Sequence, residues 1–250
     1  MREKATLSFG SLFAGIGGLD LGLERAGMTC AWQVEKDEFC RKVLTKHWPD
    51  VPKYGDIFDV GFTQLPPVDL VCGGFPCQPF SVAGKRQGAA DERYLWPELA
   101  RAVGETKPRW VLLENVPGLL AMAGEFGQVL SDLAALGFDA EWDCIPAAAV
   151  GAPHLRYRVF IVAYPKGQRC GKGRERRPSR EPSGLQDTKG ALAYRWQGNP
   201  WATEPAVGRV ANGVPSRVDR IKALGNAVVP QVAEWIGRRI IASNNRHDPD

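Results

Sequence analysis

Short apolar runs alternate with longer amphipathic runs over the first two thirds of this chain, and this alternation constrains the fold more than any other feature. The apolar runs are rich in β-branched and aromatic residues and are bounded by turn residues, which is typical of buried strands. The predicted strands cover residues 7–13, 31–35, 68–72, 110–114, 140–145 and 158–164, and the predicted helices cover residues 19–26, 38–47, 93–106 and 126–136. Strands that alternate with helices predict an α/β fold, with a doubly wound, mostly parallel sheet and helices on both faces.

The pattern changes after the last of these strands. Residues 164–205 hold nine basic and four acidic residues and are rich in glycine, proline and serine, although the whole chain has a net charge of only +4. Such a segment is either a solvated loop or a polyanion-binding surface. Regular structure is predicted again at residues 215–226 and in an amphipathic helix over residues 230–241 that starts at a proline. We expect this last helix to pack back on the first domain. The predicted division is a main domain of residues 1–163 and 206–250 with a small basic insert at 164–205.

Composition excludes several classes of site. The six cysteines lie far apart without a C-x-x-C pair and the chain has three histidines, so neither a disulfide framework nor a metal site is predicted. The glycines near the N-terminus interrupt any signal-peptide core, and no apolar run approaches membrane-spanning length. We therefore expect a cytoplasmic protein with no membrane partner, and a monomer.

One cysteine stands on a stiff loop directly after a predicted strand. The sequence Gly-Gly-Phe-Pro-Cys-Gln-Pro-Phe-Ser, residues 73–81, follows the strand at 68–72 and contains Cys77. A free cysteine usually packs in the interior as a small apolar residue. At the carboxyl end of a strand in an open α/β sheet, however, Cys77 lies where such folds bind their ligands. The loop is therefore a candidate position for a nucleophile.

A second motif predicts a cofactor site. The sequence Leu-Phe-Ala-Gly-Ile-Gly-Gly-Leu, residues 12–19, follows the first strand, Glu35 ends the next strand, and Asp56 follows a plausible third. Glycines at such a turn let a nucleotide approach the backbone, and a carboxylate at the second strand end can bind ribose hydroxyls. A dinucleotide is disfavoured because Asp20 would lie near its pyrophosphate. S-adenosylmethionine has no phosphate and carries a sulfonium cation, so it tolerates acidic neighbours.

A third strand end brings a glutamate to the same edge of the sheet. Glu114 follows the apolar run at 110–113, and this position is otherwise an ordinary solvated strand end. A cysteine, a glutamate and arginines together can activate the C5–C6 bond of a pyrimidine. A thiolate that adds to C6 pushes charge onto N3 and O2, and a proton donor at N3 and a cation at O2 would stabilise that charge.

The motifs occur together and in a specific order. They are Phe-Ala-Gly-Ile-Gly-Gly at 13–18, Glu35, Gly-Asp-Ile at 55–57, Gly-Phe-Pro-Cys-Gln at 74–78, Glu-Asn-Val at 114–116, Arg-Tyr-Arg at 156–158 and Gly-Asn-Ala-Val-Val-Pro at 225–230. In this order the chain resembles the C5-cytosine DNA methyltransferase family of the bacterial and phage type, over nearly its whole length. The resemblance implies a Rossmann-like methyltransferase fold that uses S-adenosylmethionine.

The resemblance also implies a role for each matching residue. Cys77 would be the nucleophile, Glu114 would contact N3, Arg158 would face O2, and Arg156 would lie beside the nucleophile's loop as a fourth catalytic residue. The residues implied to hold S-adenosylmethionine are Phe13, Gly15, Gly17, Glu35, Asp56, Ile57 and Asn226. The residues predicted to contact DNA are Gln78, Ser81, Lys85 and Arg86, in the loop that would close over a flipped cytosine.

The expected partners are double-stranded DNA and a cognate restriction endonuclease. The basic insert at 164–205 stands where the family has its target-recognition domain, and it is short, so we expect it to contact mainly phosphates. Lys36 follows Glu35 where the family often has a larger apolar or aromatic residue. An RNA cytosine methyltransferase, a catalytically silent DNA-binding module and a nicotinamide oxidoreductase remain alternatives.

Overall fold

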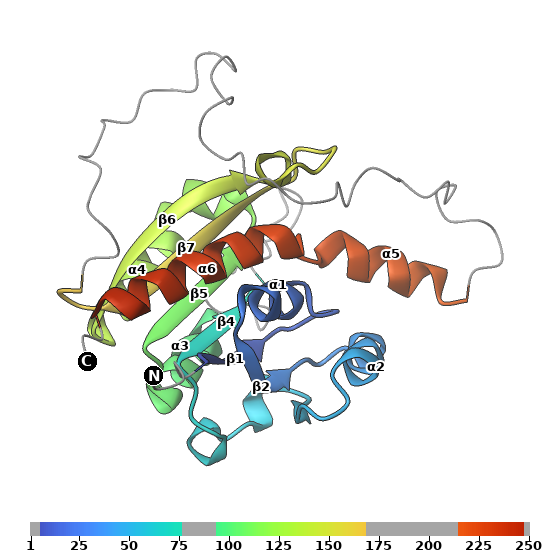
Figure 1. The fold of residues 1–250 in the computed structure, drawn as a ribbon, viewed down its shortest axis with the longest axis horizontal. Helices are drawn as coiled ribbons and strands as arrows, with labels where there is room; N and C mark the ends of the chain where they lie inside the picture. The colour runs from blue at the N-terminus through green and yellow to red at the C-terminus, as the bar shows by residue number, and fades with distance from the viewer. Residues whose placement is uncertain (1–5, 77–93, 169–214, 248–250) are drawn as a thin grey trace, which may run out of the picture.

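The structure, a computed structural model, describes residues 6–76, 94–168 and 215–247 (Figure 1). Seven strands form one sheet in the order β3-β2-β1-β4-β5-β7-β6. The strands are β1 (Ser8–Leu12), β2 (Thr29–Val34), β3 (Lys53–Tyr54), β4 (Leu70–Gly73), β5 (Trp110–Asn115), β6 (Phe138–Pro146) and β7 (Tyr157–Pro165). The order reverses between β1 and β4, as expected of a doubly wound sheet. The predicted α/β class and the positions of its strands are confirmed.

Strand direction decides which loops meet. The strands β1 to β5 run parallel to one another, whereas β7 runs antiparallel to its two neighbours, β5 and β6. The carboxyl ends of the five parallel strands therefore lie at one edge of the sheet. Because β7 runs in the opposite direction, its first residues lie at that same edge, beside the end of β5.

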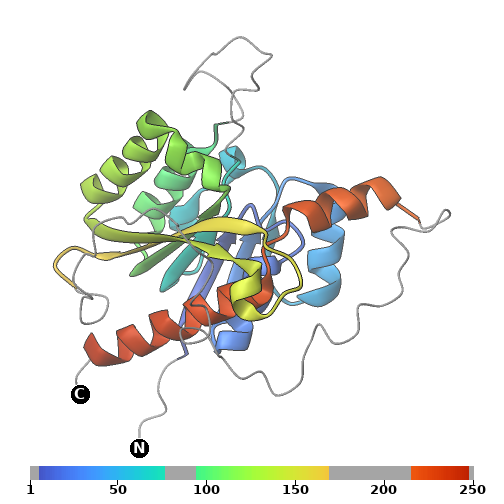
Figure 2. The same ribbon diagram turned by 90° about the horizontal axis from the view of Figure 1, so that it is seen from above.

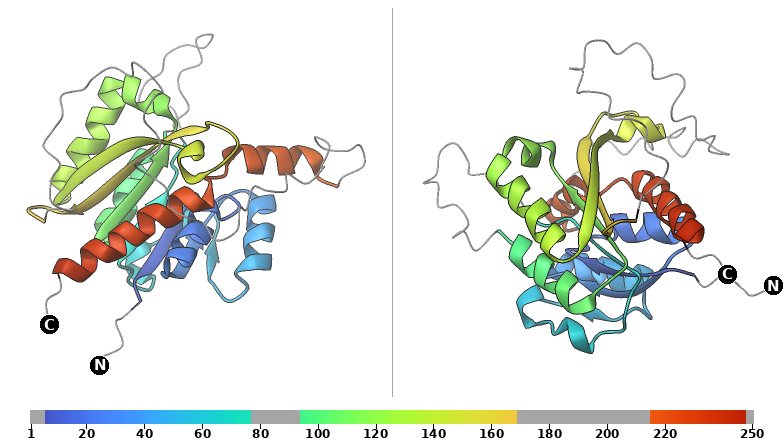
Figure 3. Two further views of the ribbon diagram at one scale, coloured as in Figure 1. Left: turned by 45° about the horizontal axis from the view of Figure 1, so that its top comes forward. Right: turned by 90° about the vertical axis from the view of Figure 1, so that its left-hand side faces the viewer.

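Helices cover both faces of the sheet (Figures 2 and 3). One face packs against α3 (Trp96–Thr106) and α4 (Ala123–Ala135), with the indole of Trp96 fully enclosed. The other face packs against α1 (Gly18–Ala26), α2 (Glu38–His47) and α6 (Pro230–His247). Each face thus has its own apolar core, which is why the strands between them are apolar on both sides.

The C-terminal helix returns to the start of the chain, as the sequence predicts. Helix α6 crosses α1 closely, because Gly22 lies against the backbone of Pro230 and the methyl group of Ala233. On its apolar side Val232, Ile236 and Ile240 are buried. Trp235 is only partly buried and its ring carries the guanidinium of Arg239 at 4.6 Å, so this residue of the predicted apolar side lies at the margin of the core.

A further helix, α5 (Arg217–Asn226), precedes α6 and extends away from the sheet (Figure 1). Its Ala223 is buried and its other residues are exposed. Among the residues that the structure describes, no helix combines the length and the apolar character needed to cross a membrane.

Candidate active site

The predicted site residues converge on one edge of the sheet. Phe13 and Glu35 directly follow the ends of β1 and β2, Asp56 is the second residue after β3, and Glu114 is the next-to-last residue of β5. Arg158 comes to the same edge from the other direction, as the second residue of the antiparallel strand β7. The topology therefore brings together residues that are far apart in the sequence.

A cavity of about 470 Å³ opens at this edge. Its volume lies within the range of about 300–1,000 Å³ that small-molecule sites in proteins occupy. The predicted residues that line it are Phe13, Gly15, Glu35, Asp56, Ile57, Glu114, Arg158 and Asn226. The cavity extends to Gly74, Phe75 and Pro76, so one continuous space joins the predicted cofactor residues to the loop that leads to Cys77.

The glycine turn forms one wall of the cavity through unusual backbone angles. Gly15 and Gly17 have φ values of 57° and 84°, and Phe13 itself has a φ of 53°. A positive φ is strained for an aromatic residue, and such strain is concentrated at functional sites. The carboxylate of Glu35 secures the turn, because its Oε2 accepts the N–H of Gly15 at 2.7 Å and its Oε1 accepts that of Asp37 at 2.7 Å.

Asp20 does not lie where the sequence argument placed it. Its carboxylate is fully buried beneath the turn, where it accepts hydrogen bonds from Ser11 Oγ at 3.0 Å and Gln33 Nε2 at 2.7 Å. Burial raises the pKa of Asp20 from 3.8 to about 6, against the opposing effect of these two hydrogen bonds. The expectation that Asp20 would repel a pyrophosphate is wrong, because helix α1 directs its side chain toward β1 and β2. The carboxylate at the turn is that of Glu35.

Two exposed ion pairs stand at the mouth of the cavity. Lys36 Nζ lies 2.6 Å from Asp56 Oδ2, and Lys222 Nζ of α5 lies 3.3 Å from Asp37 Oδ2. Lys36 lowers the pKa of Asp56. The pKa of Asp37 is lowered chiefly by the N–H of Cys40, since Asp37 is the N-cap of α2, and also by Lys222. All four side chains line the cavity, so its mouth is edged by alternating charges.

The inner end of the cavity holds a buried ion pair. Arg158 Nε lies 2.9 Å from Glu114 Oε1, with the Glu114 side chain 10% and the Arg158 side chain 21% exposed. Burial raises the pKa of Glu114, and the charges of Arg158 and Arg156 oppose this rise. Gly74 leaves room for the carboxylate, since a Cβ there would lie only 2.8 Å from Glu114 Oε2. The glycine of the Gly-Phe-Pro-Cys motif thus fits against the glutamate of the next strand.

Asn115 fixes the start of the loop that leads to Cys77. Its Nδ2 donates to the carbonyl of Phe75 at 3.0 Å, and its Oδ1 accepts the N–H of Val116 at 2.8 Å. Cys77 itself lies outside the described residues, as do Gln78, Ser81, Lys85, Arg86 and the basic insert from residue 169 onward. Burial raises the pKa of the thiol in each of the four cysteines that the structure describes, Cys30, Cys40, Cys72 and Cys144. None of these four is therefore suited to act as a thiolate near neutral pH.

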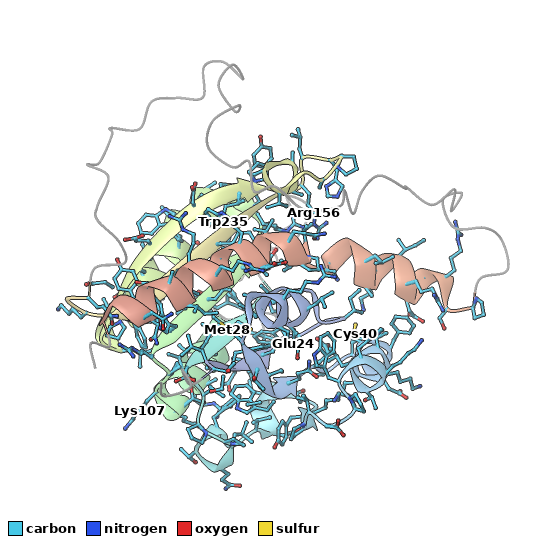
Figure 4. All side chains as sticks on the ribbon, in the orientation of Figure 1. Glu24, Met28, Cys40, Lys107, Arg156 and Trp235 are labelled. Atoms are coloured by element: carbon cyan, nitrogen blue, oxygen red, sulfur yellow. The ribbon has the colours of Figure 1, made fainter. Side chains whose placement is uncertain are left out.

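Arg156 contacts a part of the chain that the sequence did not connect with it. Its Nη2 donates to the carbonyl oxygens of Gly225 at 2.8 Å and Ala227 at 2.7 Å (Figure 4). These residues flank Asn226, which lines the cavity, whereas Arg156 lines a neighbouring groove. Of the four predicted catalytic residues, the structure brings Glu114 and Arg158 into direct contact and directs the guanidinium of Arg156 toward the turn around Asn226.

Among the cavity residues that the sequence analysis does not name, three carry a charge. Asp37, Asp219 and Lys222 all line the cavity. The Asp-Glu pair at residues 37–38 before a helical run does signal an N-cap, and it was available in the sequence. Asp219 and Lys222 carry no local signal, because the position of α5 over the cavity depends on contacts with distant residues.

Comparison with known proteins connects this geometry to a family. A family model described as C-5 cytosine-specific DNA methylase matches residues 7–197. The type II methyltransferase M.DsaV of Dactylococcopsis salina is 36% identical over 165 residues, which cover 65% of this chain and 47% of that protein. M.HhaI of Haemophilus parahaemolyticus is 34% identical over 166 residues, or 65% of this chain and 50% of that one. The chain thus spans about half the length of these curated relatives.

A solved structure gives the same result for the fold. A protein described as a DNA modification methyltransferase encoded within an E. coli prophage superposes with a TM-score of 0.56 and 29% sequence identity. The superposition covers 64% of this chain and 47% of the other. The α/β fold of this chain is therefore similar to that of a methyltransferase structure.

Proposed function

The chain belongs to the C-5 cytosine-specific DNA methylase family, and on this premise we propose that it transfers a methyl group from S-adenosylmethionine to C5 of cytosine in double-stranded DNA. The observation that carries the proposal is the buried pair of Glu114 and Arg158. It lies at the inner end of a cavity that also reaches the predicted cofactor residues and the loop before Cys77. A single space is thus available to both a base and a methyl donor.

The chemistry begins with the sulfur of Cys77, which adds to C6 of the cytosine and forms a carbon–sulfur bond. Negative charge then builds on N3 and O2 of the ring. Glu114 donates a proton toward N3, and the guanidinium of Arg158 stabilises the charge at O2. S-adenosylmethionine, when bound, would supply the electrophilic methyl group for C5 and leave as S-adenosylhomocysteine. Loss of the C5 proton to a base, return of the N3 proton to Glu114 and departure of the Cys77 thiolate from C6 restore the enzyme.

The environment of Glu114 suits the role of proton donor. A glutamic acid has an ordinary pKa of about 4.3, so a solvated side chain would be ionised at neutral pH. Burial raises the pKa of Glu114 and favours the neutral, proton-donating form. Arg158 opposes this shift and keeps the proton transferable, since a carboxylate formed beside a guanidinium is stabilised.

The residues around the cavity fit S-adenosylmethionine in charge. Carboxylates line the cavity at Glu35, Asp37, Asp56, Glu114 and Asp219, against the cations of Lys36, Arg158 and Lys222. An excess of carboxylates suits a sulfonium cation and repels phosphate. In addition, Glu35 already accepts the N–H of Gly15, which a pyrophosphate at a glycine turn would need. We propose that Phe13, Gly15, Gly17, Glu35, Asp56, Ile57 and Asn226 hold this cofactor.

The residues proposed to recognise DNA lie mainly in two segments outside the described residues, 77–93 and 169–214. A cytosine must leave the duplex to present C6 to a thiolate, at a cost of about a few kcal/mol. We propose that Gln78, Ser81, Lys85 and Arg86 contact the target strand, and that residues 164–205 form a short target-recognition segment that binds mainly phosphates. The compared relatives are named type II methyltransferases. For this chain we propose a cognate restriction endonuclease as partner and a monomer as the active form.

Methyl transfer to defined substrates tests this function directly. The purified chain is incubated with S-adenosylmethionine and with mixed-sequence duplex DNA or RNA, and the digested nucleosides are analysed by mass spectrometry. We expect 5-methyl-2′-deoxycytidine from DNA, and its loss with the Cys77→Ser protein. A Cys30→Ser protein is the matched control, because the Cys30 thiol is buried away from the cavity.

Two results would contradict the proposal. Methylcytidine produced only from RNA would assign the chain to RNA, and full activity of Cys77→Ser would remove the nucleophile. Bisulfite mapping of the methylated DNA then identifies the target site. A long and strictly defined site would contradict a short, phosphate-binding recognition segment.

A further inference from the structure

Arg156 fixes a distant turn of the chain. One guanidinium nitrogen, Nη2, donates to the carbonyls of both Gly225 and Ala227, which lie 69 and 71 residues further along the chain. These carbonyls end helix α5 and stand on either side of Asn226, a residue of the cofactor cavity. Because the charge-assisted bonds flank a single residue, they restrain the position of Asn226 from both sides.

The backbone around Arg156 is built for this contact. Arg156 has a φ of 30°, a positive value that is strained for a residue with a side chain. The strain is retained because the loop is held at its base, where the N–H of Ala147 bonds to the carbonyls of Leu155 at 2.7 Å and Arg156 at 3.3 Å. Strain of this kind persists where the surrounding structure determines it, and it is frequent at functional sites.

The same loop also reaches the base site. Arg158, two residues after Arg156, forms the ion pair with Glu114. Arg156 is close enough to Glu114 to oppose the rise in its pKa, although its hydrogen bonds go to the carbonyls around Asn226. One short segment therefore carries Arg158 into the cavity and Arg156 into the neighbouring groove, where it contacts the turn around Asn226.

The turn that Arg156 holds has a second support on the opposite side. Val228, the second residue after Asn226, lies with its backbone against Gly18 at the start of α1, where a Cβ would come within 2.5 Å of the Val228 carbonyl. Lys222 of α5 pairs with Asp37. The Asn226 turn thus sits between the glycine turn of the cofactor site and the loop of Arg156.

We propose that Arg156 is a positioning residue, which holds Asn226 in the cofactor cavity and so sets the affinity for S-adenosylmethionine, and that it does not contact DNA. This inference rests on the proposed function, since it assigns a role toward the same cofactor. It replaces the expectation of a catalytic Arg156 beside the nucleophile's loop. It also makes the segment from Arg156 to Arg158 a physical link between the cofactor and base sites.

Calorimetric binding of S-adenosylhomocysteine tests the proposal without methyl transfer. Arg156→Met removes both hydrogen bonds and keeps the length of the side chain, and we expect binding to weaken about tenfold or more. Arg156→Lys keeps one cationic donor and is expected to recover part of the affinity. Arg220→Met is the matched control, because Arg220 is an exposed arginine of α5 that also donates to a backbone carbonyl, that of Pro215 at 2.9 Å, does not line the cavity and should bind as wild type.

DNA binding distinguishes positioning from phosphate contact. If Arg156 only positions Asn226, the Arg156→Met protein keeps the wild-type dependence of DNA affinity on salt. A salt slope reduced by about one would show a lost phosphate contact and would overturn the inference. Unchanged binding of S-adenosylhomocysteine by Arg156→Met would overturn it as well. If Arg156→Met fails to fold in thermal melting, the binding of S-adenosylhomocysteine is measured with Arg156→Lys, and wild-type affinity of that protein would overturn the inference.

Failure of the two proposals can be told apart. A wild-type protein that does not bind S-adenosylhomocysteine at all overturns the proposed function, and this inference with it. A wild-type protein that binds S-adenosylhomocysteine, with an Arg156→Met protein that binds it equally well, overturns the inference alone.

Discussion

The carboxylates near the cavity form two groups, and the protein shifts their pKa values in opposite directions. Glu114 and Asp20 are buried, and burial raises the pKa of each, to about 6 for Asp20. Asp37 and Asp56 lie at the exposed mouth, and their pKa values are lowered by hydrogen bonds and by lysine partners. All four follow or lie near the ends of parallel strands or the glycine turn. The same chemical group binds its proton more tightly in one place and less tightly in the other, according to its access to water and its partners.

The buried group should have the larger effects on function and stability. A desolvated carboxyl cannot exchange its interactions for water when a partner is removed, whereas an exposed ion pair can.

Glu114→Gln removes the proton donor at the inner end of the cavity. We expect methyl transfer in single-turnover assays to slow by about 10²-fold to 10⁴-fold, the usual contribution of a positioned acid. Binding of S-adenosylhomocysteine should stay within about twofold of wild type, because the proposed role of Glu114 is toward the base and not toward the cofactor. A rate within about tenfold of wild type would remove Glu114 from the chemistry.

Asp20→Asn tests the pH dependence that burial imposes. The folded protein binds the Asp20 proton more tightly than the unfolded chain, with a pKa of about 6 instead of 3.8. Stability is therefore greatest below pH 3.8 with respect to this group, and it is lost as the pH rises through 6. Relative to Asp20→Asn, the wild-type free energy of unfolding should fall by roughly 2 kcal/mol between about pH 4 and 7 in urea titrations.

Asp56→Asn is the exposed counterpart in the same titrations. The pKa of Asp56 is lowered in the folded state, so its contribution to stability is present above the unfolded pKa and is lost as the pH falls. Relative to Asp20→Asn, the wild-type free energy of unfolding should therefore fall as the pH rises, whereas relative to Asp56→Asn it should rise with pH. If both differences change with pH in the same direction, burial does not separate these two carboxylates.

Gly74→Ala disturbs the buried group through packing alone. The new methyl group would lie 2.8 Å from Glu114 Oε2, and the carboxylate has little freedom to move because Arg158 holds it. We expect methyl transfer to fall about tenfold, since small displacements of reacting groups are costly. Gly124→Ala is the control, as nothing lies within 4 Å of its Cβ position. Equal rates for the two variants would contradict the packing argument.

The smallest effect is expected at the mouth. Lys222→Met removes the exposed pair with Asp37, whereas Asp37→Ser keeps an N-cap for α2 and removes only the charge. Each should weaken binding of S-adenosylhomocysteine by about 1.5-fold to 5-fold, and high salt should reduce the difference. The double variant should be no weaker than either single one. Lys42→Met, which breaks the Glu38 pair on the outer face of α2, should have no effect.

The order and type of the elements followed from local pattern. Each predicted strand is present with small shifts at its ends, for example β6 at Phe138–Pro146 in place of 140–145, and the C-terminal helix is longer than predicted. Apolar runs and helical spacing report burial on one or both faces, which is a local property. The site residues at strand ends were predictable for the same reason, because parallel strands end at a common edge.

Where the structure differs from the sequence-based predictions, the difference concerns the direction of a side chain or a contact between residues far apart in the chain. Asp20 was placed near the ligand, yet its side chain faces the sheet, because one residue of helix changes the direction of a side chain by about a quarter of a turn. Lys222 was missed because α5 reaches the cavity through contacts with α2 and with Arg156. Neither fact has a signature within a short window of sequence.

By itself the sequence determined the alternation of strands and helices, the family motifs and their order, and therefore which side chains stand at the ligand-binding edge. Only the tertiary structure decided which carboxyl groups are buried, that Glu114 is paired with Arg158, and that Arg156 holds the turn around Asn226. The physical reason is that desolvation and charge pairing depend on groups brought together by folding. Periodicity and motif spacing reflect residues that are close together in the sequence, and they do not give the distances between groups that are far apart in the chain.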